Sequence, residues 1–410
     1  MPPSATSARL TRPLLPIILG AAAVAARSQD LAIRVGTFNI EDVRTSDLDT
    51  PDHPRLERLA ETIQRLRPNI LLLNEIAYDL PHPDRPDEPA GRNAVRFVDR
   101  FLARPQASGL TAIEFRAWMA PVNTGEPSSF DLDRSGAAVR DWPVPAPANA
   151  DGSPPPQTPE QRAFGNDAWG FGTFPGQYGM ALLVDPRFEI LHDQIRTYRL
   201  FRWDDLPGAA QPRAPDGSPW YPPEAWASFP LPSKTLAAVP VRLPNGSILY
   251  CVISHPTPPA FDGPEQRNKL RNQDEIRLLR AYLDNAPWLV DDHGDPGGLP
   301  PGAMAVVLGD LNADPTDGNS IGEPIAHLLA SPTLGPDPRP AAESAEDRLD
   351  PTDTASFGLR VDYVLPSATL RVLRTGIWRP AAGEPSIRPS DHFPVWAEIV
   401  VPDTNTQPRP

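Results

Sequence analysis

Short apolar runs that end directly in polar residues set the pattern of this sequence. In the clearest one, residues 306–309 read Val-Val-Leu-Gly, and Asp310 and Asn312 follow two residues apart. Such a run is typical of a buried β-strand, and if the strand continues that far, its two-residue period places both polar side chains on one face. A carboxylate and a carboxamide there suit a metal ion or a phosphate, whereas an Asx-rich turn closing the strand explains the same residues. This stretch alone leaves both interpretations open.

Further strands and helices are predicted on both sides of this run. The stretch 31–40 alternates as a strand that ends near Asn39, and 69–76 is apolar enough to be buried on both faces, with Glu75 at its end. Asn245-Gly246 predicts a hairpin between 236–243 and 248–254. The other predictions are strands at 111–119, 360–365, 370–378 and 393–400, a strand pair at 178–184 and 188–198 joined by the turn Asp185-Pro186-Arg187, and helices at 56–66, 92–102, 264–283 and 325–329.

The proline and glycine content shapes the expected domain organisation. With 56 prolines and 27 glycines in 410 residues, many loops must be long, yet 40% hydrophobic residues can still form a substantial core. We therefore expect one domain over residues 31–400, with proline-rich insertions near 121–176 and 201–233. The first insertion is expected to be functional or to cover a site, because its aromatic residues would otherwise be exposed. Aromatic residues of the second could line a pocket, but packing onto the body of the domain is the expected use.

The N-terminus is typical of an export signal. Arg9 and Arg12 precede an apolar run at 13–26 that ends in small residues and is too short to span a bilayer comfortably. We therefore expect cleavage of residues 1–26 and export of the protein to the periplasm or out of the cell, without a stable membrane anchor. Residues 401–410 are polar and are expected to form a loose tail. The single cysteine, Cys251, is expected to be a small buried hydrophobe.

The net charge of −14 limits the expected partners. Tight nonspecific binding to nucleic acid needs Lys and Arg to neutralise phosphates, so the charge argues against it. Nuclease chemistry is not excluded, because a bound divalent cation and a local basic patch can offset a negative overall charge.

Many of the predicted strands end in a polar side chain that could act in catalysis or binding. Each of them has an ordinary explanation as a cap or a hydrogen-bonded turn residue, but so many chance endings are less plausible. The residues are Asn39, Glu75, His255, Asp310 with Asn312, Asp362, and Asp391 with His392.

The order and wording of these motifs resemble the endonuclease/exonuclease/phosphatase superfamily, whose fold is that of deoxyribonuclease I. The matching pieces are Phe38-Asn39, Asn74-Glu75, Ser254-His255, Gly309-Asp310-Leu311-Asn312, Val361-Asp362-Tyr363 and Ser390-Asp391-His392. The resemblance implies an α/β (α+β) fold, a four-layered sandwich of two mixed, mostly antiparallel β-sheets flanked by helices. The sequence differs from pancreatic-type deoxyribonuclease in lacking its cysteine pair, and it contains no basic recognition loop.

The resemblance also implies a role for each matching residue. Glu75 resembles the principal Mg²⁺ or Mn²⁺ ligand, with Asn39 and Asp391 nearby. His392 resembles the general base, oriented by Asp362, and Asp310 resembles the residue that positions the attacking water or assists the leaving oxygen. Asn312 and His255 resemble the residues that bind the phosphate. A histidine titrates near neutrality, which suits a general base, and Mg²⁺ prefers a site with few carboxylates. Lys234, at a predicted strand start, is a further candidate for contact with the substrate phosphate, and the alternative is a solvated lysine.

We therefore predict an exported, divalent-metal-dependent phosphoesterase that acts as a monomer, with a nuclease-like phosphodiester hydrolase ahead of the alternatives. One alternative is a phosphomonoesterase or a sphingomyelinase-like enzyme acting on a small or lipid phosphate. Another is a secreted binding protein that has lost catalysis on the same scaffold. The joint presence of Asn39, Glu75, Asp310, Asn312 and His392 speaks against the last one, since a scaffold alone would not need them.

Overall fold

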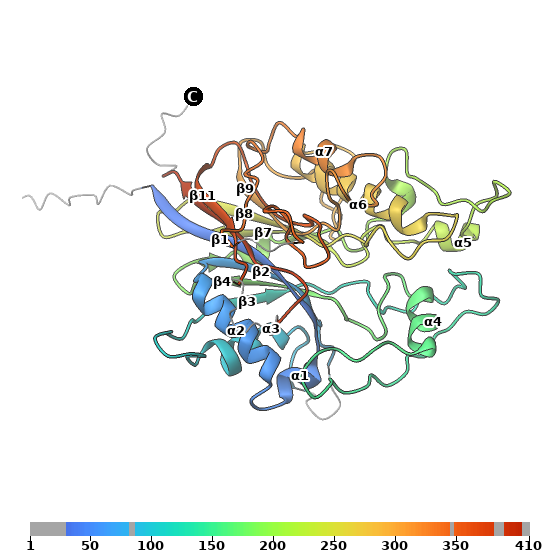
Figure 1. Cartoon of the computed structure of the whole chain (residues 1–410). Helices are drawn as coiled ribbons and strands as arrows, with labels where there is room; N and C mark the ends of the chain where they lie inside the picture. Colours follow the sequence, from blue (N-terminus) through green and yellow to red (C-terminus); the bar gives the residue numbers. More distant parts are fainter. Residues whose placement is uncertain (1–29, 82–86, 345–347, 381–388, 404–410) are drawn as a thin grey trace, which may run out of the picture.

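Two six-stranded β-sheets pack face to face, with helices on their outer faces (Figure 1). The structure is a computed structural model that describes residues 30–81, 87–344, 348–380 and 389–403. The predicted signal peptide at 1–26 lies outside the described residues. The predicted fold class, two mixed and mostly antiparallel sheets flanked by helices, is confirmed.

The first sheet has the strand order β11-β12-β1-β2-β4-β3. Only the pair β1 and β2 is parallel, and α2 provides the crossover that a parallel pair requires. Helix α2 begins with Pro54, after His53 whose side chain accepts a hydrogen bond from the Leu56 N–H. The strands are Leu31–Val43 (β1), Ile70–Ile76 (β2), Arg116–Met119 (β3), Met180–Val184 (β4), Arg371–Ile377 (β11) and Val395–Val401 (β12), and α2 is Pro54–Leu66.

The second sheet has the order β10-β9-β8-β7-β5, and β6 also pairs with β7. The predicted hairpin around Asn245-Gly246 is confirmed as β7 and β8. The parallel pair β8 and β9 is joined through α6. The bounds are Glu189–Ile190 (β5), Arg196–Thr197 (β6), Leu236–Arg242 (β7), Ile248–Ser254 (β8), Met304–Asp310 (β9), Asp362–Pro366 (β10) and Arg267–Leu283 (α6).

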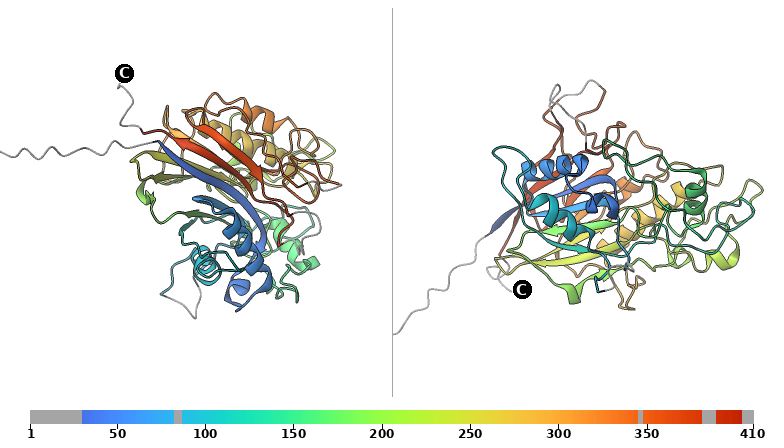
Figure 2. Two further views of the ribbon diagram at one scale, coloured as in Figure 1. Left: turned by 60° about the vertical axis from the view of Figure 1, so that its left-hand side comes forward. Right: turned by 90° about the horizontal axis from the view of Figure 1, so that it is seen from below.

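The core lies in three layers because the central strands are apolar on both faces. In β2, Ile70 and Leu72 belong to the cluster between the sheets, whereas Leu71 and Leu73 pack against α2 and α3. The right-hand view of Figure 2 shows these two helices lying across the first sheet. Cys251 is buried between the sheets as predicted. The remaining helical segments are Thr45–Asp49 (α1), Asn93–Phe97 (α3), Val98–Leu102 (η1), Pro159–Asp167 (α4), His192–Gln194 (η2), Trp203–Asp205 (η3), Pro223–Trp226 (α5) and Pro324–Leu329 (α7).

The predicted strand pair at 178–184 and 188–198 is wrong. Strand β4 lies in the first sheet and is already paired on both sides, by β2 and β3, so the following segment cannot join it. That segment crosses instead to the second sheet, where it forms the short strands β5 and β6 against β7. The turn at 185–187 is real, since Asp185 Oδ1 accepts the Arg187 N–H at 3.0 Å, but it connects two sheets.

The aromatic residues of the second insertion mainly pack onto the body, as predicted. Trp203, Tyr221 and Phe229 are buried in the cluster that α6 forms over the second sheet. The two insertions carry α4 and α5, which lie on opposite sides of the same end of the molecule (Figure 1). The first residues of the expected loose tail are ordered instead: Val401 is in β12, and the Pro402 carbonyl accepts a hydrogen bond from Ser247 Oγ at 2.8 Å. Residues 404–410 lie outside the described residues.

Candidate active site

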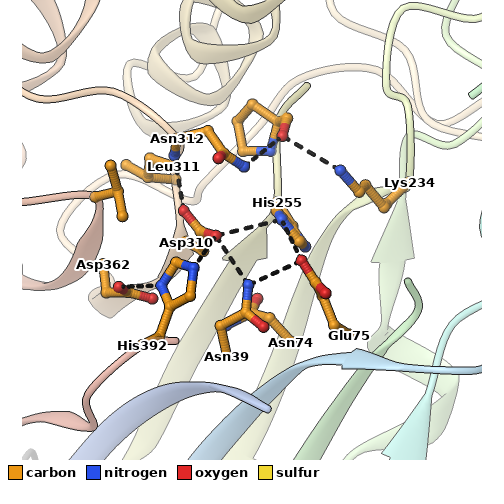
Figure 3. Close-up of polar contacts among 12 residues, drawn as sticks. Asn39, Asn74, Glu75, Lys234, His255, Asp310, Leu311, Asn312, Asp362 and His392 are labelled. Atoms are coloured by element: carbon orange, nitrogen blue, oxygen red, sulfur yellow. Dashed lines mark hydrogen bonds and ion pairs between the residues drawn. The ribbon is translucent and has the colours of Figure 1, made fainter. Parts of the chain in front are cut away.

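Polar side chains from both sheets meet where strands β1, β2, β8 and β9 end and β10 begins (Figure 3). Asn39 of β1 joins the two sheets, because its amide Nδ2 donates to Glu75 Oε1 and to Asp310 Oδ2, at 3.0 Å in both cases. The sequence-predicted residues Asn39, Glu75, His255, Asp310 and His392 therefore lie together.

An irregular backbone aims Glu75 into this space. β1 shifts register between Asn39 and Val43, and Glu41 and Asp42 in this bulge have φ values of 53° and 47°. The Asp42 N–H consequently donates to Glu75 Oε2 at 3.1 Å. Glu75 itself has a φ of 67°, a conformation that costs about 1–3 kcal/mol in a non-glycine residue and is concentrated at functional sites.

Gly309 lets the second sheet reach the site. A Cβ atom at this position would lie 1.9 Å from the Ser254 carbonyl oxygen. Only glycine therefore allows β9 to approach β8 closely enough at the end where Asp310 and His255 stand side by side.

His392 is held in a defined orientation by Asp362. The Nδ1 atom lies 2.8 Å from Asp362 Oδ2, and both side chains are buried. The backbone N–H of His392 donates to Ser390 Oγ, which in turn donates to the Asn39 carbonyl at 2.7 Å, so the loop is attached to β1. Burial alone lowers the pKa of His392, but the carboxylates of Asp362 and Asp310 outweigh it and raise that pKa well above its ordinary value.

The opposite ring nitrogen of His392 faces the centre of the site. Nε2 lies 3.8 Å from Asp310 Oδ2 and 3.9 Å from Asp391 Oδ1. Burial raises the pKa of Asp310 to about 6, although hydrogen bonds from Asn39 and from the Asn312 N–H oppose the shift. His392 thus lies between carboxylates, and its Nε2 atom faces the centre of the site.

His255 is neutral and lacks a partner on one nitrogen. Burial lowers its pKa well below the ordinary value, and the nearby positive charges of Lys234 and His392 add to the effect. Its Nε2 lies 3.5 Å from Asp310 Oδ2. Its Nδ1 is buried without a hydrogen-bond partner among the residues that the structure describes.

Asn312 reaches the site through a turn. The strand ends at Asp310, and Asn312 has a φ of 52°, so the two-residue period that places both side chains on one face stops short of Asn312. Asp310 Oδ1 accepts the Asn312 N–H at 2.9 Å, which is an Asx turn, and Asn312 Nδ2 donates to the Pro256 carbonyl at 3.1 Å. The turn and the polar site, which the sequence leaves as alternatives, are both present.

Lys234 is buried, so its alternative interpretation as a solvated lysine is wrong. The residue is 5% exposed, and its Nζ atom lies 3.4 Å from the Pro256 carbonyl, near Asn312 (Figure 3). Burial lowers the pKa of Lys234, while Glu275, Glu75 and Asp310 raise it. A buried lysine beside these carboxylates brings a positive charge to the end of the site where Asn312 and His255 lie.

The carboxylate oxygens at the centre fit a hard divalent cation. Glu75, His255 and Asp310 each offer a ligand atom within 4.8 Å of the others, and so do Asp310, Asp362 and His392. Burial raises the pKa of Glu75 to about 7, which indicates a carboxylate whose negative charge is poorly compensated. Such a group gains when a cation binds, and Mg²⁺ and Ca²⁺ prefer oxygen ligands.

The other two predicted metal ligands, Asn39 and Asp391, differ in how they interact with Glu75. The Asn39 amide turns its nitrogen toward Glu75, and its oxygen accepts the Glu41 N–H at 3.0 Å. The side chain of Asp391 is 46% exposed and its charge acts on Glu75 and Glu41. A further acidic cluster, Asp131, Asp133 and Asp167, lies in the first insertion, where backbone N–H groups of that insertion donate to all three carboxylates.

A cavity of about 560 Å³ adjoins Glu75, Lys234 and His255. Residues of both insertions and of the segment leading into α6 form its walls. They include Phe171, Ser233, Thr257 and Phe261. Sequence reasoning did not identify Ser233, Thr257, Glu41 or Asp42, because neither a bulge nor a cavity between distant insertions leaves a periodic signal.

The sequence profile described as Endonuclease/Exonuclease/phosphatase family matches residues 36–392. Solved structures with a similar fold include an endonuclease/exonuclease/phosphatase from Beutenbergia cavernae (17% identity, 90% of this chain and 72% of that chain, TM-score 0.48). Others are the human Nocturnin catalytic domain with bound sulfate (16%, 92% and 95%, 0.45) and a mannosyl-6-phosphatase from Bacteroides thetaiotaomicron (13%, 90% and 100%, 0.43). Comparison with curated proteins finds no match.

The match covers most of the chain, from β1 to the loop that carries His392. The chain therefore belongs to the Endonuclease/Exonuclease/phosphatase family and is a metal-dependent phosphoric ester hydrolase.

Proposed function

We propose that the protein is an exported phosphodiester hydrolase in which His392 is the general base. The observation that carries the proposal is the pair formed by His392 and Asp362, with Nδ1 and Oδ2 2.8 Å apart. Asp362 accepts the Nδ1 proton, so that in the deprotonated form of His392 the Nε2 atom can take a proton from water, and the raised pKa places that form toward alkaline pH. Nε2 faces Asp310, whose carboxylate can hold that water in line with the phosphorus.

Hydrogen-bond donors on the other side of the site would bind the phosphate. Neutral His255 and the Asn312 amide can donate to phosphoryl oxygens, and Lys234 supplies a positive charge. Glu75, with Asn39 and Asp391 beside it, would hold Mg²⁺ or Mn²⁺, and the bound cation would neutralise charge that develops on the phosphoryl oxygens.

The charges of the site favour a diester over a monoester. Lys234 faces the carboxylates of Glu75 and Asp310, and Asp362 and Asp391 lie next to His392. A phosphodiester carries one negative charge near neutral pH, whereas a monoester approaches two. Because Coulomb repulsion grows with the charge of the ligand, the singly charged ester is repelled less in a site with this many carboxylates.

Export is part of the proposal and is supported by the N-terminal sequence. The charged residues and the apolar run within residues 1–26 have the composition of a cleaved signal. Among the described residues, no helix is both long enough and apolar enough to cross a membrane. Cell fractionation with detection of the mature protein tests this part separately.

The catalytic proposal is tested with bis-(p-nitrophenyl) phosphate and p-nitrophenyl phosphate, in Mg²⁺, in Mn²⁺ and with chelator. We expect hydrolysis of the diester that chelator abolishes and that either metal restores. His392→Ala should lower kcat about 10²- to 10⁴-fold, the usual contribution of a general base. The matched control is His327→Ala, an exposed histidine on α7. Faster turnover of the monoester would contradict the diester assignment, and undiminished activity of a folded His392→Ala variant would contradict the mechanism.

A further inference from the structure

Buried hydroxyl groups without partners line the cavity beside Glu75. Ser233 and Thr257 are 3% and 7% exposed, and the Oγ atom of Ser233 and the Oγ1 atom of Thr257 have no hydrogen-bond partner among the described residues. A buried hydroxyl left unpaired costs about 1–3 kcal/mol. Two such groups in one cavity, next to the unpaired Nδ1 of His255, indicate that a ligand pairs them.

The backbone around these hydroxyls is rigidly placed. The Glu275 carboxylate of α6 accepts the Ser233 N–H at 2.6 Å through Oε1 and the Thr257 N–H at 2.5 Å through Oε2. One side chain thus holds the end of the second insertion against the loop that follows β8. The hydroxyls are kept together, beside Lys234, before any substrate arrives.

Two exposed aromatic rings stand at the same cavity. Phe261 is 92% exposed and has a φ of 60°, a rare conformation for a bulky residue. Its segment is tied down, because Asn268 Nδ2 donates to the Ala260 carbonyl at 2.7 Å and Asp262 accepts the Asn268 N–H at 2.8 Å. The strain is therefore maintained by the surrounding structure, as is found at ligand clamps.

The second ring, Phe171, comes from the first insertion and is 39% exposed. It packs on α4 at Gly165, where a Cβ atom would lie 2.8 Å from the Phe171 ring. One face of the ring is thereby supported, while part of the ring still faces the cavity. Aromatic side chains presented in this way bind flat rings by stacking.

The size of the cavity limits what can bind. Its volume of about 560 Å³ lies within the range of pockets for small organic ligands, roughly 300–1,000 Å³. Both insertions contribute to its walls, and the overall charge of −14 does not suit a long polyanion.

We propose that this cavity binds the alcohol part of the substrate and selects a small phosphodiester whose alcohol carries hydroxyl groups and a flat ring, the composition of a nucleoside. This inference rests on the proposed function. Ser233 and Thr257 pair with polar groups of the alcohol, Phe261 and Phe171 stack on its ring, and the phosphate lies at Lys234 and His255.

The test uses the full-length protein and two esters with the same leaving group, thymidine 5′-(p-nitrophenyl) phosphate and methyl p-nitrophenyl phosphate. We expect kcat/KM to be about tenfold or more higher for the thymidine ester, in line with the contribution of one stacked base. Phe261→Ala should reduce this preference about tenfold, and Phe171→Ala should also reduce it. Trp288→Ala, which removes a ring that is also 39% exposed but lies outside the cavity, should leave the preference unchanged.

The hydroxyl variants give a second, independent readout. Ser233→Ala and Thr257→Val remove unpaired groups, so the resistance of the free protein to urea should stay the same or increase, while KM for the thymidine ester rises severalfold. Loss of stability in these variants would show a structural role and overturn their assignment.

The outcomes separate this inference from the proposed function. Equal hydrolysis of the two esters by the wild-type protein, or faster turnover of an oligothymidylate than of the thymidine ester, would overturn the cavity assignment and leave the phosphodiesterase intact. An equal loss on both esters in Phe261→Ala would do the same. Absence of hydrolysis of either ester would overturn the proposed function, and this inference with it.

Discussion

Replacing Glu75 by Gln should make the metal-free protein more stable at neutral pH and less able to bind a cation. Glu75 lies at the junction of the sheets beside the cavity, with its side chain 21% exposed, and burial raises its pKa from 4.5 to about 7. That difference corresponds to about 3 kcal/mol by which the folded state disfavours the ionised carboxylate above pH 7. The group therefore opposes folding whenever it is ionised and no cation is bound.

The sign of the pH dependence follows from proton uptake. Between pH 4.5 and about 7 the folded state binds more protons at Glu75 than the unfolded state does. The contribution of Glu75 to stability is therefore full below 4.5 and is lost as the pH rises toward 7. Gln cannot ionise, so the variant should lack this loss.

The expected gain in the free energy of unfolding is smaller than the electrostatic cost of the ionised carboxylate, because Gln has only one acceptor oxygen. Asn39 Nδ2 and the Asp42 N–H both donate to the Glu75 carboxylate, and one of them loses its acceptor, at a cost of about 1 kcal/mol. In chelator, Glu75→Gln should thus increase the free energy of unfolding by about 2 kcal/mol at about pH 8, and decrease it slightly at about pH 4.

Urea denaturation at the two pH values, with chelator and with Mn²⁺, measures this effect. Mn²⁺ at a hundredfold excess over its Kd should stabilise the wild-type protein by about 2.7 kcal/mol and the variant much less. Glu57→Gln, at a partly exposed carboxylate of α2 that pairs with Arg104, is the control for loss of a carboxylate. An equal response of wild type and Glu75→Gln to Mn²⁺ would refute Glu75 as the metal ligand, and a gain that is the same at both pH values would refute the electrostatic reasoning.

Two further predictions concern the groups around the phosphate. In Asp362→Asn the pKa of His392 should fall, because its closest carboxylate partner is removed. The acid limb of the pH–rate profile should therefore shift to lower pH, and kcat should decrease. An unchanged His392 titration in ¹⁵N NMR would contradict this prediction. Lys234→Met should raise KM for a diester about tenfold or more, which is the usual loss when a charged hydrogen bond is removed. The variant should resist urea as well as the wild-type protein does, because burial already disfavours the charged amine. An unaltered KM would place Lys234 outside the phosphate site.

The sequence indicated the strands and the motifs because both depend on local order. Apolar runs such as 306–309 must be buried, and their two-residue period places alternate side chains on opposite faces whatever the remainder of the chain does. The turn Asn245-Gly246 specified a hairpin by its own backbone preference. The same local logic placed polar residues at strand ends, and with the family resemblance it predicted which of them meet.

Pairing between distant segments was decided only by the tertiary structure. The segment after Asp185 is strand-like in isolation, but β4 already has neighbours on both edges, so the chain had to cross to the other sheet. Lys234 is an ordinary lysine in the sequence and is buried in the structure, where its Nζ atom lies against the Pro256 carbonyl of the loop that follows β8. The sequence thus determined the strands and the polar residues at their ends. The cavity, the strained conformations of Glu75 and Phe261, and the unpaired hydroxyls exist only because segments far apart in the chain pack against one another.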